Sequence, residues 1–515
     1  MLNQYPYHVM LSDLLRALVE CDLSHDVAIV GITADSRKIK PGYAFVAYPG
    51  HQCDGRDFIE SAVRSGASAI LMESPTGKDG SQLRSFSLTN SEKKTIPVVY
   101  VLNLQNLYGV FVSRFYKDPS RQLTVVGITG TNGKSSIMHL YNCALNGLGI
   151  KSGFIGTLGS GIAGKLVEQD HTTPDAAMLH QQLAKMRDSH VEQVVMEVSS
   201  HGLDQSRVNG CIFDTAILSN VTRDHLDYHA TQEEYLEAKA KLFAKPFLRN
   251  IVVNIDDQFG KELFIRYSSE RNVIGYSLDK KYLGHRSVVV AHQIKSDLDG
   301  STFEIRSPWG VGQMKTQLIG RFNVYNLLAA FTSMCLHDTH FEDALESLSL
   351  VHSIPGRMNR FGGDGVPKVF VDYAHTSDAL VKVMSSIKQH SKEGKLIVLF
   401  GCGGDRDRGK RMLMGQAASK YADFIVLTDD NPRFENPDRI IDDILTGIDN
   451  QDNVDVEHDR SIAIAKAFKL ATPDDIVLIA GKGHESFQHI AGQKYPFSDS
   501  EQVQMLIRAN TQQVV

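Results

Sequence analysis

The chain lacks the sequence features of a disulfide-linked or membrane-embedded protein. Its 515 residues include only six cysteines, and none of them forms a C-x-x-C pair. Neither a disulfide framework nor a thiolate zinc site is therefore predicted. No basic and apolar leader opens the sequence, and no hydrophobic run approaches the length of a membrane span. We expect a protein that stays in a reducing cytoplasm.

An excess of basic residues is also missing. The 54 lysines and arginines are outnumbered by 60 aspartates and glutamates, which gives a formal net charge of -6. Nucleic acid is therefore not expected as a partner, although local basic sites for phosphates remain possible. No internal repeat or low-complexity tract interrupts the chain. A single core does not extend over this length, so we expect three domains.

Short apolar runs alternate with helical patterns along the whole sequence, which predicts an α/β fold. Residues 1–105 are expected to form a small α/β domain, in which the polar stretch from Thr76 to Lys94 is interpreted as a surface loop. Residues 106–350 predict a central parallel sheet with a nucleotide at its carboxyl edge. Residues 351–515 predict a second, doubly wound sheet.

The most informative segment is a strand pattern that ends in a glycine-rich turn and opens a helix. Such a turn lets backbone N–H groups approach a polyphosphate, while Lys134 can contact the terminal phosphates and the Ser135 hydroxyl can ligate magnesium. Gly127 lies one residue too early for the common G-x-x-x-x-G-K-[ST] spacing, so the loop is a variant. The predicted phosphate loop comprises Gly130, Thr131, Asn132, Gly133, Lys134, Ser135 and Ser136.

Carboxylates and histidines follow the next predicted strands. Glu197 ends one of them and is a candidate magnesium ligand. In the cluster from Asn220 to His229, the residues alone leave two interpretations open for Asp224 and His229, namely a helix cap with a surface histidine, or a site. Beside a phosphate loop, a metal role for His225 is favoured. Lys239 falls in an amphipathic helical pattern, where spacing alone places a lysine in solvent.

Three loops of the third domain each follow a predicted strand and are rich in glycine and charge. They are Gly401–Arg411, Asp430–Arg433 and Gly481–Glu485. Because the carboxyl ends of parallel strands share one edge, the loops should lie together. Arginines suit carboxylates, and Asp430 or Glu485 suits an ammonium group, so a small zwitterionic ligand is predicted. A purely structural role is the alternative.

These motifs, in this order, resemble the Mur ligases over almost the whole chain. The segments Asp35-Ser36-Arg37, Gly50–Arg56, Thr172-Thr173-Pro174 and Glu197–Leu203 also carry the resemblance. Within the family, the chain resembles the members that add the third amino acid of the peptidoglycan stem. The resemblance implies an N-terminal domain for the uridine nucleotide, a central ATP-binding domain and a C-terminal Rossmann-like domain for the incoming amino acid.

The resemblance also implies roles for individual residues. Those implied to bind the UDP-N-acetylmuramoyl-dipeptide are Ser36, His51, Gln52, Thr172, Thr173, Ser199, Gln205 and Arg207. Beyond the phosphate loop, the implied ATP contacts are Asn323, Arg357, Asp372 and His375. The implied diaminopimelate contacts are Arg406, Asp430, Asn431, Arg433, Gly481 and Glu485. The implied catalytic residues are Lys134, Glu197, His225 and Lys239. Lys239 is implied to become a carbamate with CO2 and to ligate Mg2+ with Ser135, Glu197 and His225.

The implied reaction is ATP-dependent ligation of meso-diaminopimelate to UDP-N-acetylmuramoyl-L-alanyl-D-glutamate through an acyl phosphate, in peptidoglycan synthesis. A monomer with no nucleic-acid or membrane partner is expected. Arg433 favours diaminopimelate, because an arginine fork can pair with the second carboxylate of that amino acid. Two departures from the family pattern, Ser135-Ser136-Ile137 and Ser377 in place of proline, leave open a paralogue with a related substrate. The alternatives are a ligase for lysine or for a polyglutamyl tail, a phosphate-loop switch protein and a silent binding protein.

Overall fold

The computed structural model describes residues 7–19, 23, 26–50, 53–74, 86–89, 94–162, 165–169, 171–226, 228–363, 365–390 and 394–511. The chain divides into two compact units. The first comprises Met1–Gly127, Lys151–Asp214 and Lys241–Leu248, and the second comprises Ile128–Ile150, Thr215–Ala240 and Arg249–Val515.

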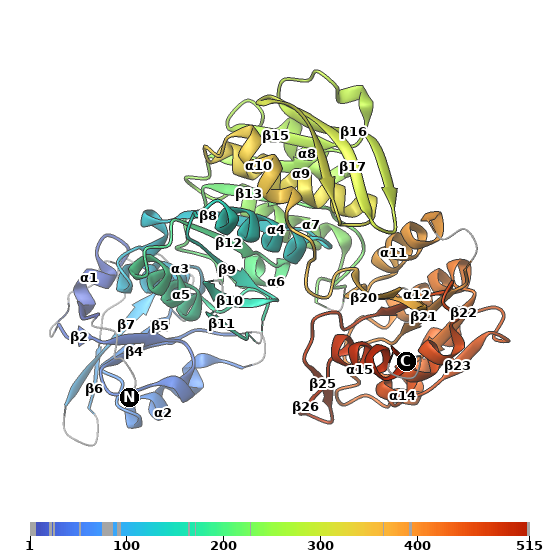
Figure 1. Cartoon of the computed structure of the whole chain (residues 1–515). Coiled ribbons are helices and arrows are strands. Elements are labelled where there is room, and N and C mark those ends of the chain that lie inside the picture. The colour runs from blue at the N-terminus through green and yellow to red at the C-terminus, as the bar shows by residue number, and fades with distance from the viewer. Residues whose placement is uncertain are drawn as a thin grey trace. The chain divides into compact units, whose positions relative to one another are not determined.

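A five-stranded sheet opens the first unit and lies in the blue part of Figure 1. Its strand order is β3-β4-β5-β7-β6. Its strands are β3 (Gly31–Thr33), β4 (Tyr43–Ala47), β5 (Ala69–Glu73), β6 (Phe86–Thr89) and β7 (Thr95–Val101). Successive residues of β4 point to opposite faces, as the strand period requires. One face packs under α1 (Leu11–Leu15) and α3 (Leu104–Phe115), and the other packs under α2 (Ile59–Arg64). A short ribbon of β1 (Val9–Met10) and β2 (Ala28–Ile29) adjoins α1 along the chain.

Strand β6 corrects the prediction of a surface loop from Thr76 to Lys94. The strand pairs antiparallel with β7, and Phe86 lies opposite Val98 in the register. The sequence Phe86-Ser87-Leu88-Thr89 alternates apolar and polar residues, which is a strand pattern. The many serines and lysines around it concealed that short pattern. Residues 76–85 and 90–93 lie outside the described residues.

The rest of the first unit lies within residues 106–350, the range predicted as a central domain. Its strands follow the order β11-β10-β9-β12, and β8 comes next to β12. Strands β9 and β12 are parallel, whereas β10 is antiparallel to both β9 and β11. The elements are β8 (Thr124–Thr129), β9 (Ser152–Gly156), β10 (Gly159–Ile162), β11 (Lys165–Val167), α5 (Ala176–Asp188), β12 (Gln193–Glu197) and α6 (Ser200–Asp204).

The second unit begins with a sheet of order β13-β14-β15-β16-β17-β18. Its strands are β13 (Thr215–Leu218), β14 (Asn250–Asn254), β15 (Asn272–Ser277), β16 (Val288–Asp297), β17 (Gly300–Ser307) and β18 (Gly310–Thr316). The first four are parallel, as predicted, but β16 to β18 form an antiparallel meander, so the sheet is mixed.

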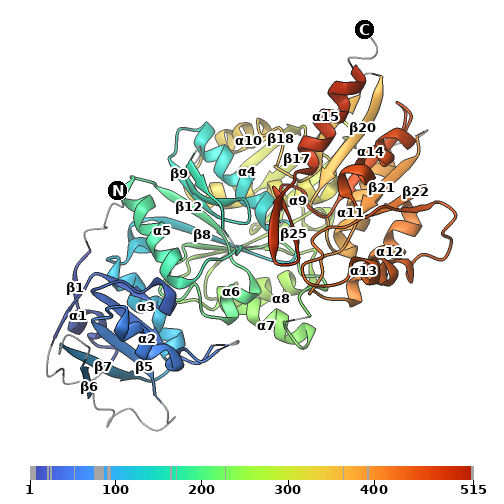
Figure 2. The ribbon, with the colours of Figure 1, turned by 90° about the horizontal axis from the view of Figure 1, so that it is seen from below.

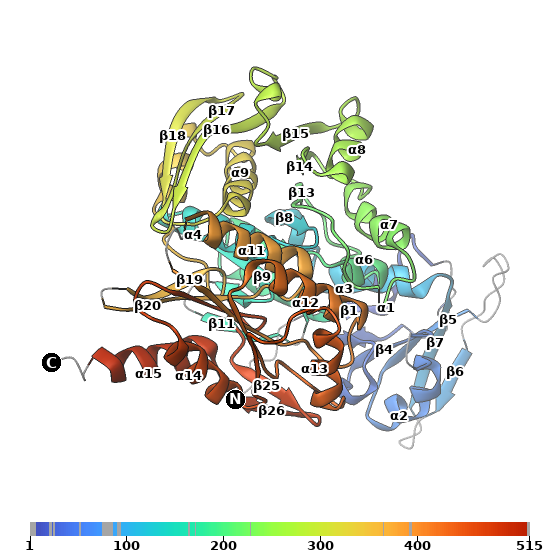
Figure 3. The same cartoon turned by 90° about the vertical axis from the view of Figure 1, so that its right-hand side faces the viewer.

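Helices cover both sides of this sheet. Figure 3 shows α8 (Gln258–Tyr267) and α9 (Arg321–Leu336) on either side of β13 and β14. Helix α4 (Lys134–Gly147) packs with α9 and with α10 (Phe341–Ser349) (Figure 2). Helix α7 (Gln232–Phe243) carries Lys239. The helix that begins at the phosphate loop is thus held against the second unit's own core.

The C-terminal part of the second unit is a doubly wound sheet of order β19-β20-β24-β21-β22-β23. All of its pairs are parallel except β19 with β20. The strands are β19 (Asn359–Gly363), β20 (Val366–Asp372), β21 (Leu396–Phe400), β22 (Phe424–Leu427), β23 (Val454–Val456) and β24 (Ile476–Ala480), and a separate hairpin consists of β25 (Phe487–Ile490) and β26 (Gln493–Pro496).

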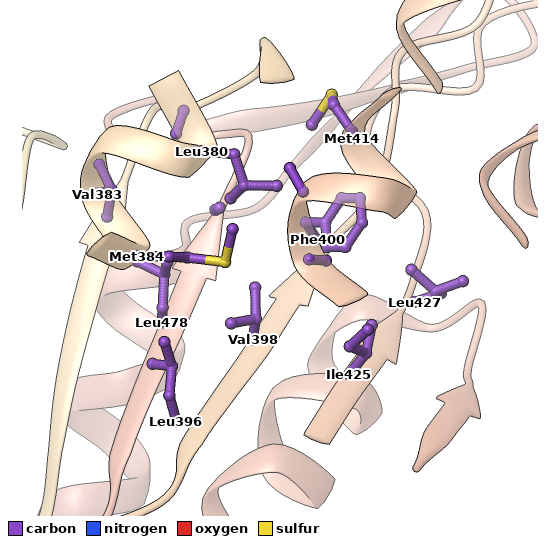
Figure 4. Close-up of a cluster of buried hydrophobic side chains, with 14 of the residues drawn as sticks. Leu380, Val383, Met384, Leu396, Val398, Phe400, Met414, Ile425, Leu427 and Leu478 are labelled. Carbon is purple, nitrogen blue, oxygen red and sulfur yellow. The ribbon is translucent and has the colours of Figure 1, made fainter. Parts of the chain in front are cut away.

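Helices also cover both faces of the C-terminal sheet. One face packs against α11 (Ser377–His390), α12 (Gly409–Tyr421) and α13 (Pro437–Leu445). The other packs against α14 (Arg460–Leu470) and α15 (Asp499–Thr511) (Figure 3). Figure 4 shows how Met384 of α11 and Met414 of α12 point toward Val398 and Phe400 of β21. The predicted α/β architecture is confirmed.

Two further findings concern the cysteines and the helices of the described residues. The five cysteines in the described part of the chain are all free thiols. None of the described helices combines the length and the apolar character that a membrane span requires.

Candidate nucleotide and amino-acid sites

The phosphate loop lies between the end of β8 and the start of α4 and depends on two glycines. Gly130 and Gly133 have φ angles of +144° and +91°, which favour residues without a Cβ. A Cβ on Gly130 would lie 2.0 Å from the Ser219 hydroxyl oxygen, and one on Gly133 would lie 2.6 Å from Oδ1 of Asn326. The loop therefore takes a form that glycine allows, at the N-terminus of a 14-residue helix, where the first backbone N–H groups have no partner within the helix.

Ser219 and Asn220, which follow β13, fix this loop from one side. The Thr131 N–H donates to the Asn220 carbonyl oxygen at 2.7 Å, and the Asn132 N–H donates to Oδ1 of Asn220 at 3.1 Å. The Ser219 hydroxyl donates to the Asn132 carbonyl oxygen at 2.6 Å. The sequence places Asn220 within a polar cluster, but it does not show that Ser219 and Asn220 hold the phosphate loop. Only the fold brings the end of β13 beside the loop.

Two lysines meet at the loop. Nζ of Lys134 donates to the carbonyl oxygens of Gly130 and Thr131, each at 2.9 Å. Nζ of Lys239 donates to the same Gly130 oxygen at 3.0 Å and lies 4.3 Å from the ring centroid of Tyr235. Lys239 is 1% exposed, so the interpretation of a solvated lysine is wrong. Burial, followed by the charge of Lys134, holds the pKa of Lys239 well below its usual value.

The cluster after β13 is also more buried than its sequence suggested. His229 is buried, so it is not a surface residue. No helix begins at Asp224, which instead accepts a hydrogen bond from the His225 N–H at 2.9 Å. Burial alone would raise the pKa of Asp224, but His225, then His375 and Lys410, lower it to about 2. The carboxylate therefore remains ionised at the edge of the loop.

Arg357 reaches the phosphate loop from the start of the C-terminal region. Its Nη2 lies 3.4 Å from the Ser135 hydroxyl oxygen, and its guanidinium stacks 4.4 Å from the ring centroid of Tyr373. Nε of Arg357 is buried without a hydrogen-bond partner. A guanidinium held flat on a ring beside the helix N-terminus is suited to a phosphate oxygen.

Asp372, at the end of β20, supports this arginine loop. Its carboxylate accepts the N–H of Met358 at 2.8 Å and the N–H of Ala374 at 2.7 Å. Burial raises the pKa of Asp372. His375 follows two residues later, and burial, then Lys410, lower its pKa to about 4, so its imidazole is neutral at pH 7.

Asn323 lies on α9, one helical turn before Asn326, and does not itself face the phosphate loop. Its Nδ2 donates to the Ile319 carbonyl oxygen at 2.9 Å, and its Oδ1 accepts from Asn326 at 3.2 Å. Asn326 is the residue that faces Gly133. The structure therefore brings Asn326 to the loop and places Asn323 behind it.

A cavity of about 510 Å³ opens beside the loop, within the second unit. Its walls include Asn132, Gly133 and Ser136 of the loop and Arg357 and Asp372 of the C-terminal region. The volume falls within the usual range for small-molecule sites. The cavity can hold a nucleoside whose phosphates extend to the helix N-terminus.

The three charged loops of the C-terminal sheet meet at one edge, as predicted. Nδ2 of Asn431 donates to Oε2 of Glu485 at 2.9 Å. Gly481 has a φ of +112°, and a Cβ there would lie 2.7 Å from Oδ2 of Asp430. The Gly404 N–H donates to the Asn431 carbonyl oxygen at 2.9 Å. Carboxylates, an amide and closely packed backbone are thereby gathered in one place.

Arg433 and Arg406 both lie beside Gly403 in this place. A Cβ built on Gly403 would lie 2.9 Å from Nη1 of Arg433 and 3.7 Å from Cγ of Arg406. Arg433 has a φ of +55° and donates to the Gly404 carbonyl oxygen at 2.6 Å. Burial, then the neighbouring Arg406, lower the pKa of Arg433. Two neighbouring cations of this kind favour an anionic ligand.

Arg411, at the end of the Gly401–Arg411 loop, binds neighbouring carboxylates of the protein. Its guanidinium is fully buried and donates to both oxygens of Glu435, at 2.9 and 2.7 Å, and to Asp443 at 2.9 Å. Arg411 therefore fastens this loop to its neighbour. The two acidic partners lie 24 and 32 residues away, so no local sequence pattern reveals the contact.

In the first unit, five residues predicted to bind the UDP-sugar peptide form a connected network. The Thr173 hydroxyl donates to the backbone carbonyl oxygen of Glu197 at 2.9 Å and lies 3.1 Å from the Ser199 hydroxyl oxygen. Arg207 donates to the Thr173 carbonyl oxygen at 2.8 Å and to Oε1 of Gln205. Thr172 joins through Thr157, whose N–H donates to Oε1 of Glu197 at 2.8 Å.

The remaining predicted contacts of the UDP group lie in the N-terminal domain. Ser36 begins a short 3-10 turn, Ser36–Lys38. Nζ of Lys38 in that turn lies 3.8 Å from Oδ2 of Asp175, which follows Thr173 by two residues. His51 and Gln52 lie outside the described residues.

The predicted metal ligands belong to different parts of the chain. Ser135, His225 and Lys239 are in the second unit, and Glu197 is in the first. Within the described ranges, no group of three or more histidine, cysteine, aspartate and glutamate side chains could hold a metal ion. A hydroxyl, an imidazole and a carboxylate are nonetheless donors that suit Mg2+ beside a polyphosphate. The metal set stays a prediction.

The fold and the phosphate loop define an α/β nucleotide-binding protein in which a second sheet carries a separate charged site. Comparison with known proteins gives the class a name. Residues 28–116 match the model described as Mur ligase family, catalytic domain; residues 128–334 match Mur ligase middle domain; residues 356–483 match Mur ligase, glutamate ligase domain. The chain belongs to the Mur ligase family, whose members are ATP-dependent amide ligases.

Individual relatives agree over nearly the full length. A protein of Coxiella burnetii named UDP-N-acetylmuramoyl-L-alanyl-D-glutamate--2,6-diaminopimelate ligase is 44% identical over 492 residues, which cover 96% of this chain and 98% of that protein. A solved structure of the same name has a TM-score of 0.69 and 33% identity, and covers 98% of this chain and 99% of its own. The ADP complex of MurF ligase from Thermotoga maritima, at 17% identity and a TM-score of 0.61 over 94% of this chain and 98% of its own, shares the fold.

Proposed function

We propose that this protein is the ATP-dependent ligase that adds 2,6-diaminopimelate to UDP-N-acetylmuramoyl-L-alanyl-D-glutamate in peptidoglycan synthesis. Relatives of that name match the chain at 42 to 44% identity. The observation that carries the amino-acid assignment is that two arginines, Arg433 and Arg406, lie next to the same position, Gly403, and that the charge of Arg406 acts on Arg433. Lysine has one carboxylate and diaminopimelate has two, so a second cationic contact strengthens the binding of diaminopimelate but not that of lysine.

The reaction divides into two steps. The terminal carboxylate of the acceptor's D-glutamate attacks the γ-phosphorus of ATP, which forms an acyl phosphate and releases ADP. The amine of diaminopimelate, after losing a proton, then attacks the acyl carbon, and inorganic phosphate leaves as the amide forms. Cleavage of ATP thereby drives the formation of an amide bond, which does not form to a useful extent in water from a free carboxylate and an amine.

Residues of the second unit are suited to the first step. The phosphate loop offers backbone N–H groups at the start of α4, and Lys134 can move from two carbonyl oxygens to the phosphates. Arg357 beside Ser135 can bind charge that develops on the transferred group. Mg2+, when bound by Ser135 and by the other predicted ligands, offsets charge on the phosphates. The cavity beside the loop suits the adenosine group.

We also propose that Lys239 reacts with CO2. A carbamate forms only from a neutral amine, and burial together with Lys134 lowers the pKa of Lys239. The ammonium group first loses one proton, and the neutral Nζ then bonds to the carbon of CO2 and loses a second proton. A buried cation thereby becomes an anion that suits Mg2+ together with Glu197 and His225. The test is activity of Lys239→Ala with and without added acetate. Rescue by the free carboxylate supports the carbamate, whereas equal activity of Lys239→Ala and wild type contradicts it.

The acceptor is proposed to bind the network of Thr172, Thr173, Ser199, Gln205 and Arg207, with its uridine nucleotide at Ser36, His51 and Gln52. Support comes from the hydrogen bonds that join the first five residues. The proposed domains are residues 1–105 for the UDP-sugar, 106–350 for ATP and 351–515 for the amino acid. We expect a monomer.

The test is phosphate release by the purified protein with ATP, Mg2+, bicarbonate and the UDP-muramoyl-dipeptide, for each amino acid in turn. Release should require both the acceptor and an amine, and diaminopimelate should exceed lysine. Release with lysine alone would favour the lysine-adding ligase. Hydrolysis that needs no amine would favour the switch protein.

A further inference from the structure

Lys482 is a buried lysine in the loop after β24, and the predicted site residues do not include it. Its side chain is 0% exposed. It lies between Gly481 and Gly483, whose φ angles are +112° and +54°. These two left-handed residues turn the chain so that the lysine points inward instead of into solvent.

Three predicted contacts of the incoming amino acid surround this ammonium group. Nζ of Lys482 donates to Oε2 of Glu485 at 2.8 Å and to Oδ1 of Asn431 at 3.1 Å, and it lies 3.8 Å from Oδ1 of Asp430. Asn431 donates in turn to Oε2 of Glu485 at 2.9 Å. Lysine, amide and carboxylate therefore form a closed triangle.

The triangle fixes how its members face a ligand. Oδ1 of Asn431 also accepts the His489 N–H at 2.9 Å, so the amide group cannot turn over without losing three hydrogen bonds. Oε2 of Glu485 accepts both hydrogen bonds, from Asn431 and from Lys482, so Oε1 takes no part in the triangle. The lysine also offsets one of the two neighbouring carboxylates, Asp430 and Glu485, which would otherwise repel each other and the carboxylates of an amino acid.

We propose that Lys482 is a positioning residue of the amino-acid site. It orients Asn431 and Glu485 and sets the charge of the pocket, so that a diamino dicarboxylate binds in preference to lysine. This inference rests on the proposed function, because it takes the three loops to be the amino-acid site. A merely structural lysine would affect stability but would not affect one substrate more than another.

Lys482→Met removes the charge and keeps a chain of similar length. We expect the KM for diaminopimelate to rise about tenfold to one-hundredfold, because a carboxylate and an amide lose a charged partner. The KM for ATP should change by less than about threefold, and the ratio of kcat/KM for diaminopimelate to that for lysine should fall.

The matched control is Lys494→Met. Lys494 is exposed on β26, and its Nζ lies 4.6 Å from the ring centroid of Phe487, the ring that lies 6.0 Å from Nζ of Lys482. The control changes the same residue type near the same ring, outside the triangle. Its KM values should match those of the wild type.

Thermal unfolding shows whether the variant folds. If Lys482→Met is unfolded, Lys482→Arg keeps the charge but changes the geometry of the two hydrogen bonds, and the KM for diaminopimelate should still rise more than the KM for ATP. Wild-type KM values in either folded variant, or an equal loss for ATP and diaminopimelate, would overturn the inference. Failure of the wild type to use diaminopimelate would instead overturn the proposed function.

Discussion

Lys134 and Lys239 donate hydrogen bonds to one carbonyl oxygen, that of Gly130, at 2.9 and 3.0 Å. Two ammonium groups this close repel each other, and the fully buried one has its pKa lowered. A bound phosphate would give Lys134 a stronger partner than a carbonyl oxygen. The nucleotide site thus contains one lysine suited to bind charge and one suited to be neutral.

The first prediction concerns Lys134. Lys134→Ala should lower kcat for ADP formation by about 10²-fold to 10³-fold or more, because the γ-phosphate loses a positioned cation in the transition state. Lys420→Ala, an exposed lysine on α12, is the control and should match the wild type. ADP formation measured by a coupled assay decides, and unchanged turnover in Lys134→Ala would refute the role of the phosphate loop.

The second prediction concerns amino-acid choice. Arg433→Ala should reduce the preference for diaminopimelate over lysine by about tenfold or more, because a buried charge-assisted contact to the second carboxylate is lost. Arg408→Ala removes a neighbouring guanidinium whose side chain is 72% exposed, and it should leave the preference unchanged. Competition between the two amino acids, followed by product analysis, gives the ratio. An unaltered ratio in Arg433→Ala would contradict the assignment.

The third prediction concerns acid stability. The hydrogen bonds from Arg411 lower the pKa of Glu435 to about 2, below its usual value near 4.3. A carboxyl group with a lowered folded-state pKa stabilises the fold above its unfolded pKa, and this contribution is lost as the pH falls toward 2. The stability difference between wild type and Glu435→Gln should therefore be about 3 kcal/mol at pH 7 and about 1 kcal/mol at pH 3.

Urea unfolding at the two pH values measures this difference. Glu346→Gln, an exposed glutamate on α10, serves as the control and should show little difference at either pH. A difference for Glu435→Gln that does not depend on pH would show that the ion pair with Arg411 is not what lowers the pKa.

The fourth prediction concerns Ser377, which stands where the family pattern has proline. Ser377 is the first residue of α11, and the Thr376 hydroxyl accepts the Ala379 N–H at 3.2 Å. The first N–H of a helix has no partner within the helix, and proline has the φ angle that this position needs. Ser377→Pro should raise the free energy of unfolding by about 0.4–1 kcal/mol. Ser377→Ala is the control, and destabilisation by proline would show that this N–H is needed.

Local sequence predicted the parts of the site that depend on short patterns. The strand and glycine turn before Lys134 identified the phosphate loop, and the positions of three loops after strands placed Asn431, Gly481 and Glu485 at one edge. These inferences succeed because the signal lies within a few residues and because parallel strands align their carboxyl ends.

Contacts between distant segments could not be predicted in this way. The burial of Lys239 depends on packing of α7 against the loop, and Arg411 finds its partners in Glu435 and Asp443. In the sequence, Lys482 cannot be distinguished from any other lysine in a glycine-rich loop. Only the fold shows that its side chain is buried. The antiparallel direction of β16 to β18 was missed for the same reason, since strand patterns carry no sign of orientation.

The most direct test of the account uses acceptor labelled with 18O in the carboxylate of its D-glutamate. With ATP, Mg2+, bicarbonate and diaminopimelate, the account predicts the tripeptide product and inorganic phosphate that carries one labelled oxygen, because that oxygen passes through the acyl phosphate. Unlabelled phosphate, or ATP hydrolysis without the tripeptide product, would contradict it.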